Sequence, residues 1–412
     1  MNLEENTTKE TKPSNPETVL KIFLIAIAFV GLAGGFSDAI LANYFKEAYA
    51  VNAAQRGFIE FPRELPGVLS FLFLAWLSAL GNVRNAVLAQ LLGAAGLVVL
   101  GFFRPSYAVM LVFLFIFSTG VHMFLPLGDS IGLSLAQRMN MGRIMGRINS
   151  VRMTFLMLSG VLTFVGFRVG WFDFELPAWV FIIGAACFFM AGALLVAQRR
   201  IGGALSDGPP VERAKFVFRK AYLRYYLICA VFGGRKQIML VYSPWVLIDL
   251  LDFKADTISI LAVVGSLIGI FFMPVVGRWI DCFGIRRVMT AEALAFVAVY
   301  IAYGFLSRWV NNNVVALTGI GMMFVYLLNI VDRMSAQFSM VRSIYMRSIA
   351  LAPEDVTPSL TLGMAIDHVV AIVGSYVCGL VWFRWGPEFV FLIAGVLSLA
   401  NLIAAQGIKE NY

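Results

Sequence analysis

Charged residues are scarce in this chain of 412 residues. Asp, Glu, Lys and Arg make up 14% of it, whereas hydrophobic residues make up 60%. A soluble domain carries about 25% charged residues, and its helices show polar faces that are almost absent here. The mean hydropathy of +0.83 agrees. Composition therefore excludes an ordinary soluble protein and predicts a protein that is mostly embedded in a membrane.

Cysteine is also rare, and its spacing excludes two common uses. No two cysteines form a Cys-x-x-Cys pair, and all of them lie in or at the edge of apolar stretches: Cys187, Cys229, Cys282 and Cys378. We expect small apolar side chains here, with neither a disulfide nor a metal site. No phosphate-binding loop, His-Glu-x-x-His pair or nucleophile elbow occurs either. The sequence therefore predicts no cofactor and no enzyme.

Long apolar stretches are abundant instead. A helix needs about 20 apolar residues to cross the hydrocarbon core of a bilayer. On this basis we predict twelve spans, at residues 20–44, 57–80, 86–103, 106–128, 151–170, 177–197, 223–250, 257–280, 287–307, 313–335, 359–383 and 388–406. The expected fold is an all-α integral membrane protein.

The basic residues predict how these spans are oriented. Lys and Arg in short loops gather on the cytoplasmic side. If the N-terminus is inside, the inner segments carry roughly three times as many Lys and Arg as the outer ones. This bias needs an even number of spans and both termini in the cytoplasm. It also explains the net charge of +8, so we expect no nucleic acid partner. A monomer in the cell membrane (plasma or inner) is predicted.

One polar segment divides the chain into two halves. Residues 198–222 are basic and contain Gly-Gly and Pro-Pro breaks, which is typical of a linker. The predicted organisation is a cytoplasmic tail at 1–18, a six-helix bundle at 19–197, a cytoplasmic linker at 198–222, a second six-helix bundle at 223–406 and a short cytoplasmic tail at 407–412.

A loop between two predicted spans carries the sharpest motif. Residues 277–287 read GRWIDCFGIRR. This resembles the cytoplasmic loop signature of the major facilitator superfamily, Gly-x-x-x-Asp-Arg-x-Gly-Arg-Arg/Lys. Two basic positions of that signature are Cys282 and Ile285 here. The glycines permit a tight turn, and the aspartate could latch an inner gate by pairing with basic side chains. The candidate gating residues are Gly277, Asp281, Gly284, Arg286 and Arg287.

The resemblance implies the fold and the mode of action. Two six-helix bundles would rock about a central site near the bilayer midplane, lined mainly by helices 1, 4, 7 and 10. We expect a secondary active transporter for a small polar or anionic organic solute, coupled to protons. The alternatives are an uncoupled facilitator, an efflux pump for amphipathic compounds, and, from another class, a lipid-handling or non-transporting protein that keeps the fold.

Ionisable residues inside spans are costly, so they identify candidate substrate contacts. Arg235 and Lys236 lie near the middle of a predicted span, where an anionic group of the substrate is the obvious partner. Asp38 follows several glycines that would let a neighbouring helix approach closely. The alternative for the two cations is internal pairing with Asp38 or Glu60.

The remaining intramembrane charges are candidates for proton coupling. Glu60, Arg63 and Glu64 share one helical face, and the alternative is a salt-bridge cluster that fastens two helices. The only two histidines, His122 and His368, both lie in spans, and histidine titrates near physiological pH. His122 could equally be a satisfied core residue. Asp367 and His368 form the preferred proton-exchanging pair.

Overall fold

The computed structural model describes residues 16–135, 141–202, 218–312, 319–352 and 355–408. These residues form helices, turns and short connections, with no strand among them. The first half contains α1 (Pro16–Gly35), α2 (Leu41–Tyr49), α3 (Ala53–Trp76), α4 (Asn82–Phe102), α5 (Tyr107–Leu135), α6 (Met141–Arg168) and α7 (Trp179–Gly202). The second half contains α8 (Leu223–Trp245), α9 (Ala255–Asn311), α10 (Ile320–Met334), α11 (Ser339–Ile349), α12 (Val356–Trp385) and α13 (Pro387–Gln406).

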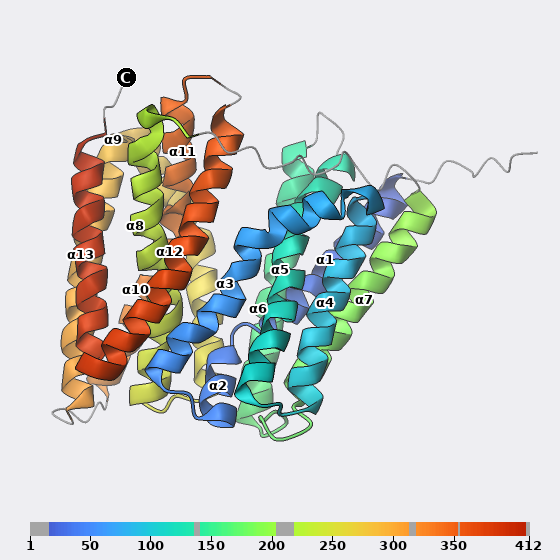
Figure 1. Cartoon of the computed structure of the whole chain (residues 1–412), viewed down its shortest axis with the longest axis horizontal. Coiled ribbons are helices and arrows are strands. Elements are labelled where there is room, and N and C mark those ends of the chain that lie inside the picture. Colours follow the sequence, from blue (N-terminus) through green and yellow to red (C-terminus); the bar gives the residue numbers. More distant parts are fainter. Residues whose placement is uncertain (1–15, 136–140, 203–217, 313–318, 353–354, 409–412) are drawn as a thin grey trace, which may run out of the picture.

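The two halves stand side by side as separate helical groups (Figure 1). They meet mainly where α3 packs against α12 and where α6 packs against α9. Within the described part of the chain, eight helices are long and apolar enough to cross a membrane. The predicted all-helical membrane architecture is therefore confirmed, while the count of twelve crossings and the cytoplasmic termini stay predictions.

Two of the predicted spans are joined in one long helix, α9. Its 57 residues include both 257–280 and 287–307. The chain bends at Gly284, whose backbone has φ 80° and ψ 162°. Residues with a Cβ rarely adopt this conformation. The glycine expected to make a tight turn in the motif therefore does so, and it separates α9 into two arms.

The first predicted span is interrupted. α1 ends at Gly35 and α2 starts at Leu41, with a turn over residues 36–40 between them. A Cβ on Gly31 would lie 2.5 Å from the carbonyl oxygen of Arg152, so the expected close approach of a neighbouring helix occurs with α6. The turn places Asp38 at a break in the helix rather than inside a continuous one.

The helical segment predicted at 313–335 ends later than the sequence indicates. α10 continues through a 3-10 turn at Ser335–Phe338 into α11, so the helical segment extends to Ile349. The predicted bounds place Asp332 and Arg333 at the end of this span. The structure corrects this, because a further helical stretch follows them and Asp332 is fully buried.

Polar contacts join the two halves at one end of the molecule, which we call the α2 end (lower edge of Figure 1). Asn43 of α2 donates a hydrogen bond of 2.8 Å to the carbonyl oxygen of Phe253, and Lys46 forms an ion pair with Asp249. Arg168, at the end of α6, lies 3.4 Å from a carboxylate oxygen of Asp256 in α9. The opposite end, which contains the bend of α9, is called the Gly284 end.

Candidate functional site

A cavity of about 370 Å³ lies between the two halves. In the first half, the residues that line the cavity belong to the break between α1 and α2, to α3 and to α6. α8, α9 and α10 contribute from the second half. The polar side chains in this lining are Asp38, Arg56, Glu60, Arg63, Glu64, Gln237, Ser259, Ser266 and Arg333.

The helices around the cavity differ in part from the expected set of 1, 4, 7 and 10. The first, seventh and tenth predicted spans do contribute, through Asp38, Gln237 and Arg333. The fourth span, which is α5, supplies none of the described lining residues. α3 replaces it, because the charged face predicted at the start of that helix points into the cavity.

Glu60 is the centre of a charged cluster on α3. One of its carboxylate oxygens accepts hydrogen bonds from Arg56, at 2.5 Å, and from Arg63, at 2.8 Å. The other accepts a hydrogen bond of 2.9 Å from the amide of Gln237, in α8 of the other half. Glu60 is almost completely buried. A carboxylate in the membrane is thus stabilised by two cations and also connects the two halves.

Asp38 is held much more loosely. Its closest cation is Arg63, whose guanidinium nitrogen lies 3.8 Å away, and 49% of the Asp38 side chain is exposed. A pair this long and this hydrated contributes little binding energy. Asp38 therefore keeps a carboxylate that can accept hydrogen bonds from a molecule in the cavity.

Arg333 is a cation in the cavity that forms no ion pair within 4 Å with a described carboxylate, although it interacts electrostatically with the neighbouring Asp332. Its Nε donates a hydrogen bond of 3.1 Å to Asn329, and it takes part in none of the ion pairs formed by the described residues. The rest of its guanidinium fork can bind a carboxylate or phosphate in a bidentate manner.

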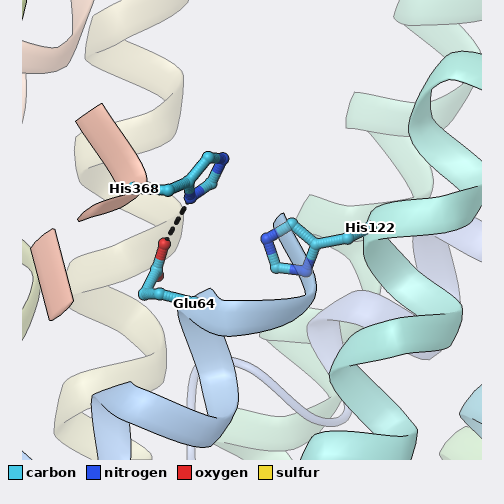
Figure 2. Close-up of side chains that lie close together, drawn as sticks. All are labelled: Glu64, His122 and His368. Atoms are coloured by element: carbon cyan, nitrogen blue, oxygen red, sulfur yellow. Dashed lines mark hydrogen bonds and ion pairs between the residues drawn. The ribbon is translucent and has the colours of Figure 1, made fainter. Parts of the chain in front are cut away.

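Glu64 belongs to a second cluster, at the side of the cavity, with both histidines (Figure 2). Nδ1 of His368, in α12, lies 2.8 Å from a carboxylate oxygen of Glu64, in α3. His122 approaches from α5, with its ring centre 5.5 Å from that of His368. The sequence placed these three residues in one functional class, and the structure brings them together across the two halves.

Asp367 and His368 do not form a pair with each other. Asp367 accepts a hydrogen bond of 2.7 Å from Lys236, in α8 of the same half, whereas His368 turns to Glu64. Neither Asp367 nor Lys236 is among the lining residues of the cavity. Proton exchange between the two neighbours stays a prediction, and in this conformation their side chains take different partners.

Arg235 lies outside the cavity, so this conformation does not place it on a substrate. It is 1% exposed and forms an ion pair with Glu292 in the second arm of α9, whose other oxygen accepts a hydrogen bond of 3.0 Å from Asn401. The Arg235 guanidinium also packs over the rings of Phe232 and Phe296. The structure thus favours internal pairing, with Glu292 as the partner rather than Asp38 or Glu60.

The gating motif lies at the Gly284 end, away from the cavity. Asp281 is exposed, and none of the ion pairs found among the described residues includes it. Its expected latch role therefore concerns another conformation and stays a prediction, as do the roles of Gly277, Arg286 and Arg287.

Sequence reasoning missed several residues that the structure makes prominent. Glu292 is a carboxylate inside a predicted span, so the rule that selected Arg235 would also have selected it. Arg56 was placed just outside a span and Arg333 at a helix end, and an error of a few residues in each boundary hid them. Gln237 is uncharged, and no pattern in the sequence distinguishes it.

Comparison with known proteins agrees with this architecture. A mutant of the nucleoside transporter NupG superposes with a TM-score of 0.76 at 16% identity, covering 95% of this chain and 100% of that one. An auto-inhibited POT family peptide transporter gives 0.73 at 14% identity, with 96% and 98% covered. A D-xylose–proton symporter gives 0.65 at 14% identity, with 95% and 98% covered.

These likenesses are weak in sequence and show the fold alone. No curated protein matches the sequence. The family comparison is decisive, because the sequence model described as Major Facilitator Superfamily matches residues 23–353, which is most of the chain. The cavity between two helical halves, the bent glycine of the loop motif and this match agree. The chain belongs to the Major Facilitator Superfamily and is a multi-pass membrane transporter.

Proposed function

We propose that the chain is a proton-coupled secondary transporter of a small organic anion that also carries a hydrogen-bond donor. The observation that supports this most directly is Arg333, a cavity cation without an ion-pair partner among the described residues. An anionic group of the solute binds the guanidinium of Arg333. A hydroxyl or ammonium group of the same solute binds the loosely held carboxylate of Asp38.

The cavity is suited to alternating access. Its walls come from both halves. A solute that enters from one side of the membrane and binds between the halves can be released on the opposite side when the halves rock apart there. With the N-terminus in the cytoplasm, the Gly284 end faces the cytoplasm and the closed α2 end faces outward. We also propose that the protein is a monomer and resides in the cell membrane.

Glu60 is the proposed proton carrier. Its carboxylate accepts hydrogen bonds from two cations and from Gln237, and Asp38 is the other carboxylate near Arg63. Protonation of Glu60 would weaken its bonds to Arg56 and Arg63 and its link to α8. A proton taken up here is therefore a means to loosen the contact between the halves. Without such coupling the protein would be a facilitator, the main alternative.

The anion-binding role is tested by a thermal-shift screen of purified protein. The panel pairs small carboxylates and phosphates with neutral analogues of the same size. We expect stabilisation by an anion but not by its neutral analogue. Arg333→Gln should abolish that stabilisation, because a lost hydrogen bond to a charged group costs roughly 1.5–3 kcal/mol, or about 10- to 150-fold in affinity.

Two further variants make this test selective. Arg333→Lys keeps the charge but not the bidentate fork, so it should recover only part of the affinity. Arg384→Gln removes an exposed arginine outside the cavity and should bind as the wild type does. If Arg333→Gln still binds the anion normally, the proposed site is wrong. A screen in which amphipathic compounds alone stabilise the protein would favour an efflux pump or a lipid-handling role.

A further inference from the structure

Three side chains that commonly bind metals gather where the two halves meet. Glu64 of α3, His122 of α5 and His368 of α12 offer ligand atoms that all lie within 4.8 Å of one another. Figure 2 shows the side chains reaching toward one space from three separate helices. We propose that this cluster binds one divalent transition-metal ion of the Zn²⁺ class, and that the bound ion fastens the two halves together.

The donor set fits such an ion. Two imidazoles and one carboxylate bind Zn²⁺ in sites that leave a fourth position for water. At Zn–N distances of 2.0–2.1 Å, tetrahedral ligand atoms lie roughly 3.3 Å apart. The ion would replace the hydrogen bond of 2.8 Å between Glu64 and His368, so these two atoms separate by about half an ångström. His122 approaches by a side-chain movement of about 1.5 Å or less.

His122 is already oriented as a metal ligand should be. Its Nδ1 lies 2.9 Å from the carbonyl oxygen of Ser118, and an Nδ1–H that donates there leaves the lone pair of Nε2 free. Within the described residues Nε2 has no hydrogen bond. Metal-binding histidines are usually held in this way by a backbone carbonyl on the second nitrogen, which fixes the tautomer and the ring orientation.

The position of His368 depends on a glycine in the facing helix. A Cβ on Gly67, in α3, would lie 2.6 Å from Cε1 of the His368 ring. A side chain at this position would therefore force the His368 ring to shift from its present place. Gly67 makes room for His368 in the other half, and the cluster is a site built from both halves rather than a chance meeting of exposed groups.

The composition of the chain makes the test unusually clean. His122 and His368 are the only two histidines in the full sequence, so any imidazole-bound metal in the tag-free protein must be at this cluster. We expect the full-length, tag-free protein in detergent to bind one Zn²⁺ per chain. Co²⁺ should give the visible absorption of a nitrogen- and oxygen-ligated ion at the same stoichiometry.

Variants separate this site from other sources of metal binding. His122→Asn and His368→Asn should each weaken Zn²⁺ binding at least about tenfold, and Gly67→Ala should weaken it by a similar factor without removing a ligand. The control Cys282→Ser removes the exposed cysteine and should bind as the wild type does. Unchanged binding in both histidine variants, or lost binding in the cysteine control, would overturn the site.

The fastening is measured separately, by the distance between spin labels on the two halves. Leu80, after α3, and Leu351, before α12, are both exposed and are replaced by cysteines in the Cys282→Ser background. Zn²⁺ should narrow the distribution of distances in this protein but not after His122→Asn. If Zn²⁺ binds and the distribution stays the same, the ion does not join the halves and that part of the proposal is wrong.

Discussion

The buried ion pair of Arg235 and Glu292 is sensitive to the loss of either partner alone. Removal of one partner leaves an uncompensated charge in a low-dielectric interior, which costs about 3–5 kcal/mol. Replacement of both partners by neutral groups of similar shape avoids that cost. The pair therefore serves the integrity of the second half, and its loss should affect stability before it affects the binding of a solute.

This argument predicts the behaviour of three variants. Arg235→Gln and Glu292→Gln should each lower the thermal stability of the protein in detergent strongly, by the equivalent of about 3–5 kcal/mol. The double variant should recover most of the loss. Melting curves of the three proteins and the wild type provide the measurement. Additive losses in the double variant would mean that the two side chains do not stabilise each other.

Coupling through Glu60 gives a second prediction at the level of single residues. Glu60→Gln keeps the size of the side chain but cannot carry a proton. It should permit exchange of solute between the two sides of a vesicle and should abolish accumulation driven by a pH gradient. Transport assays in proteoliposomes distinguish the two activities. Accumulation that persists in Glu60→Gln would place the coupling elsewhere.

At the level of helices, α3 and α12 pack so closely that glycines are required between them. A Cβ on Gly57 would lie 2.3 Å from the carbonyl oxygen of Ser375 and 2.6 Å from the hydroxyl of Tyr242. That hydroxyl donates a hydrogen bond to the same carbonyl. The contact between the two halves therefore depends on direct approach of backbone to backbone near the α2 end.

Gly57→Ala should disturb this contact. Overpacking of a close interface costs about 1–3 kcal/mol, so the variant should melt at a lower temperature than the wild type. Gly374→Ala, in α12, is the matched control, because a Cβ there has no neighbour within 4 Å. It should be neutral or slightly stabilising, by about 0.5–1 kcal/mol, since alanine favours a helix. Equal effects in both variants would contradict the close contact.

Sequence patterns were informative about elements and less so about their ends. Runs of apolar residues located the membrane helices for two reasons. A helix in the bilayer must make its backbone hydrogen bonds within itself, and it needs enough apolar residues to cross the hydrocarbon core. The break at residues 36–40 and the extension through Ser335–Phe338 were not visible, since both depend on contacts with other helices. Arg333 is an example. The predicted span ends just after it, which indicated a residue near the membrane surface, whereas the structure places it in the lining of the cavity.

The candidate site was predictable in its residues but not in its pairings. Glu60, Glu64, His122 and His368 were selected because buried charges are costly and therefore rare. Which of them meet depends on how α3, α5 and α12 cross, and no periodicity encodes that. Asp367 and His368 illustrate the limit, because neighbours in a helix point about 100° apart and here reach different helices.

For the whole molecule, the contact of Asn43 with Phe253 predicts that a cross-link stops transport. Asn43→Cys with Phe253→Cys should be joined by a short bis-methanethiosulfonate cross-linker, since the Asn43 amide and the Phe253 backbone lie in hydrogen-bonding contact. The cross-linker should block transport in vesicles and a reductant should restore it. Each single variant treated with the same cross-linker is the control. Full transport by the cross-linked protein would show that this end does not open.

Orientation in the membrane gives another prediction at this scale. A reporter fused after Tyr412 should be cytoplasmic, and one inserted near residue 253 should be external, because the basic loops gather toward the Gly284 end. Reporter activity in intact and permeabilised cells provides the measurement. If both reporters fall on the same side, the count of twelve crossings is wrong.

The closed α2 end has a consequence for how tightly a solute appears to bind. Three polar contacts hold that end shut. Arg168 is 72% exposed, so its pair with Asp256 contributes little. If the other two contacts contribute about 1 kcal/mol each, the open form is rarer by a factor of roughly 30. A solute offered from that side meets few binding-competent molecules, and its apparent dissociation constant rises by the same factor. Half-saturating concentrations should therefore differ between right-side-out and inside-out vesicles, although both report a single site.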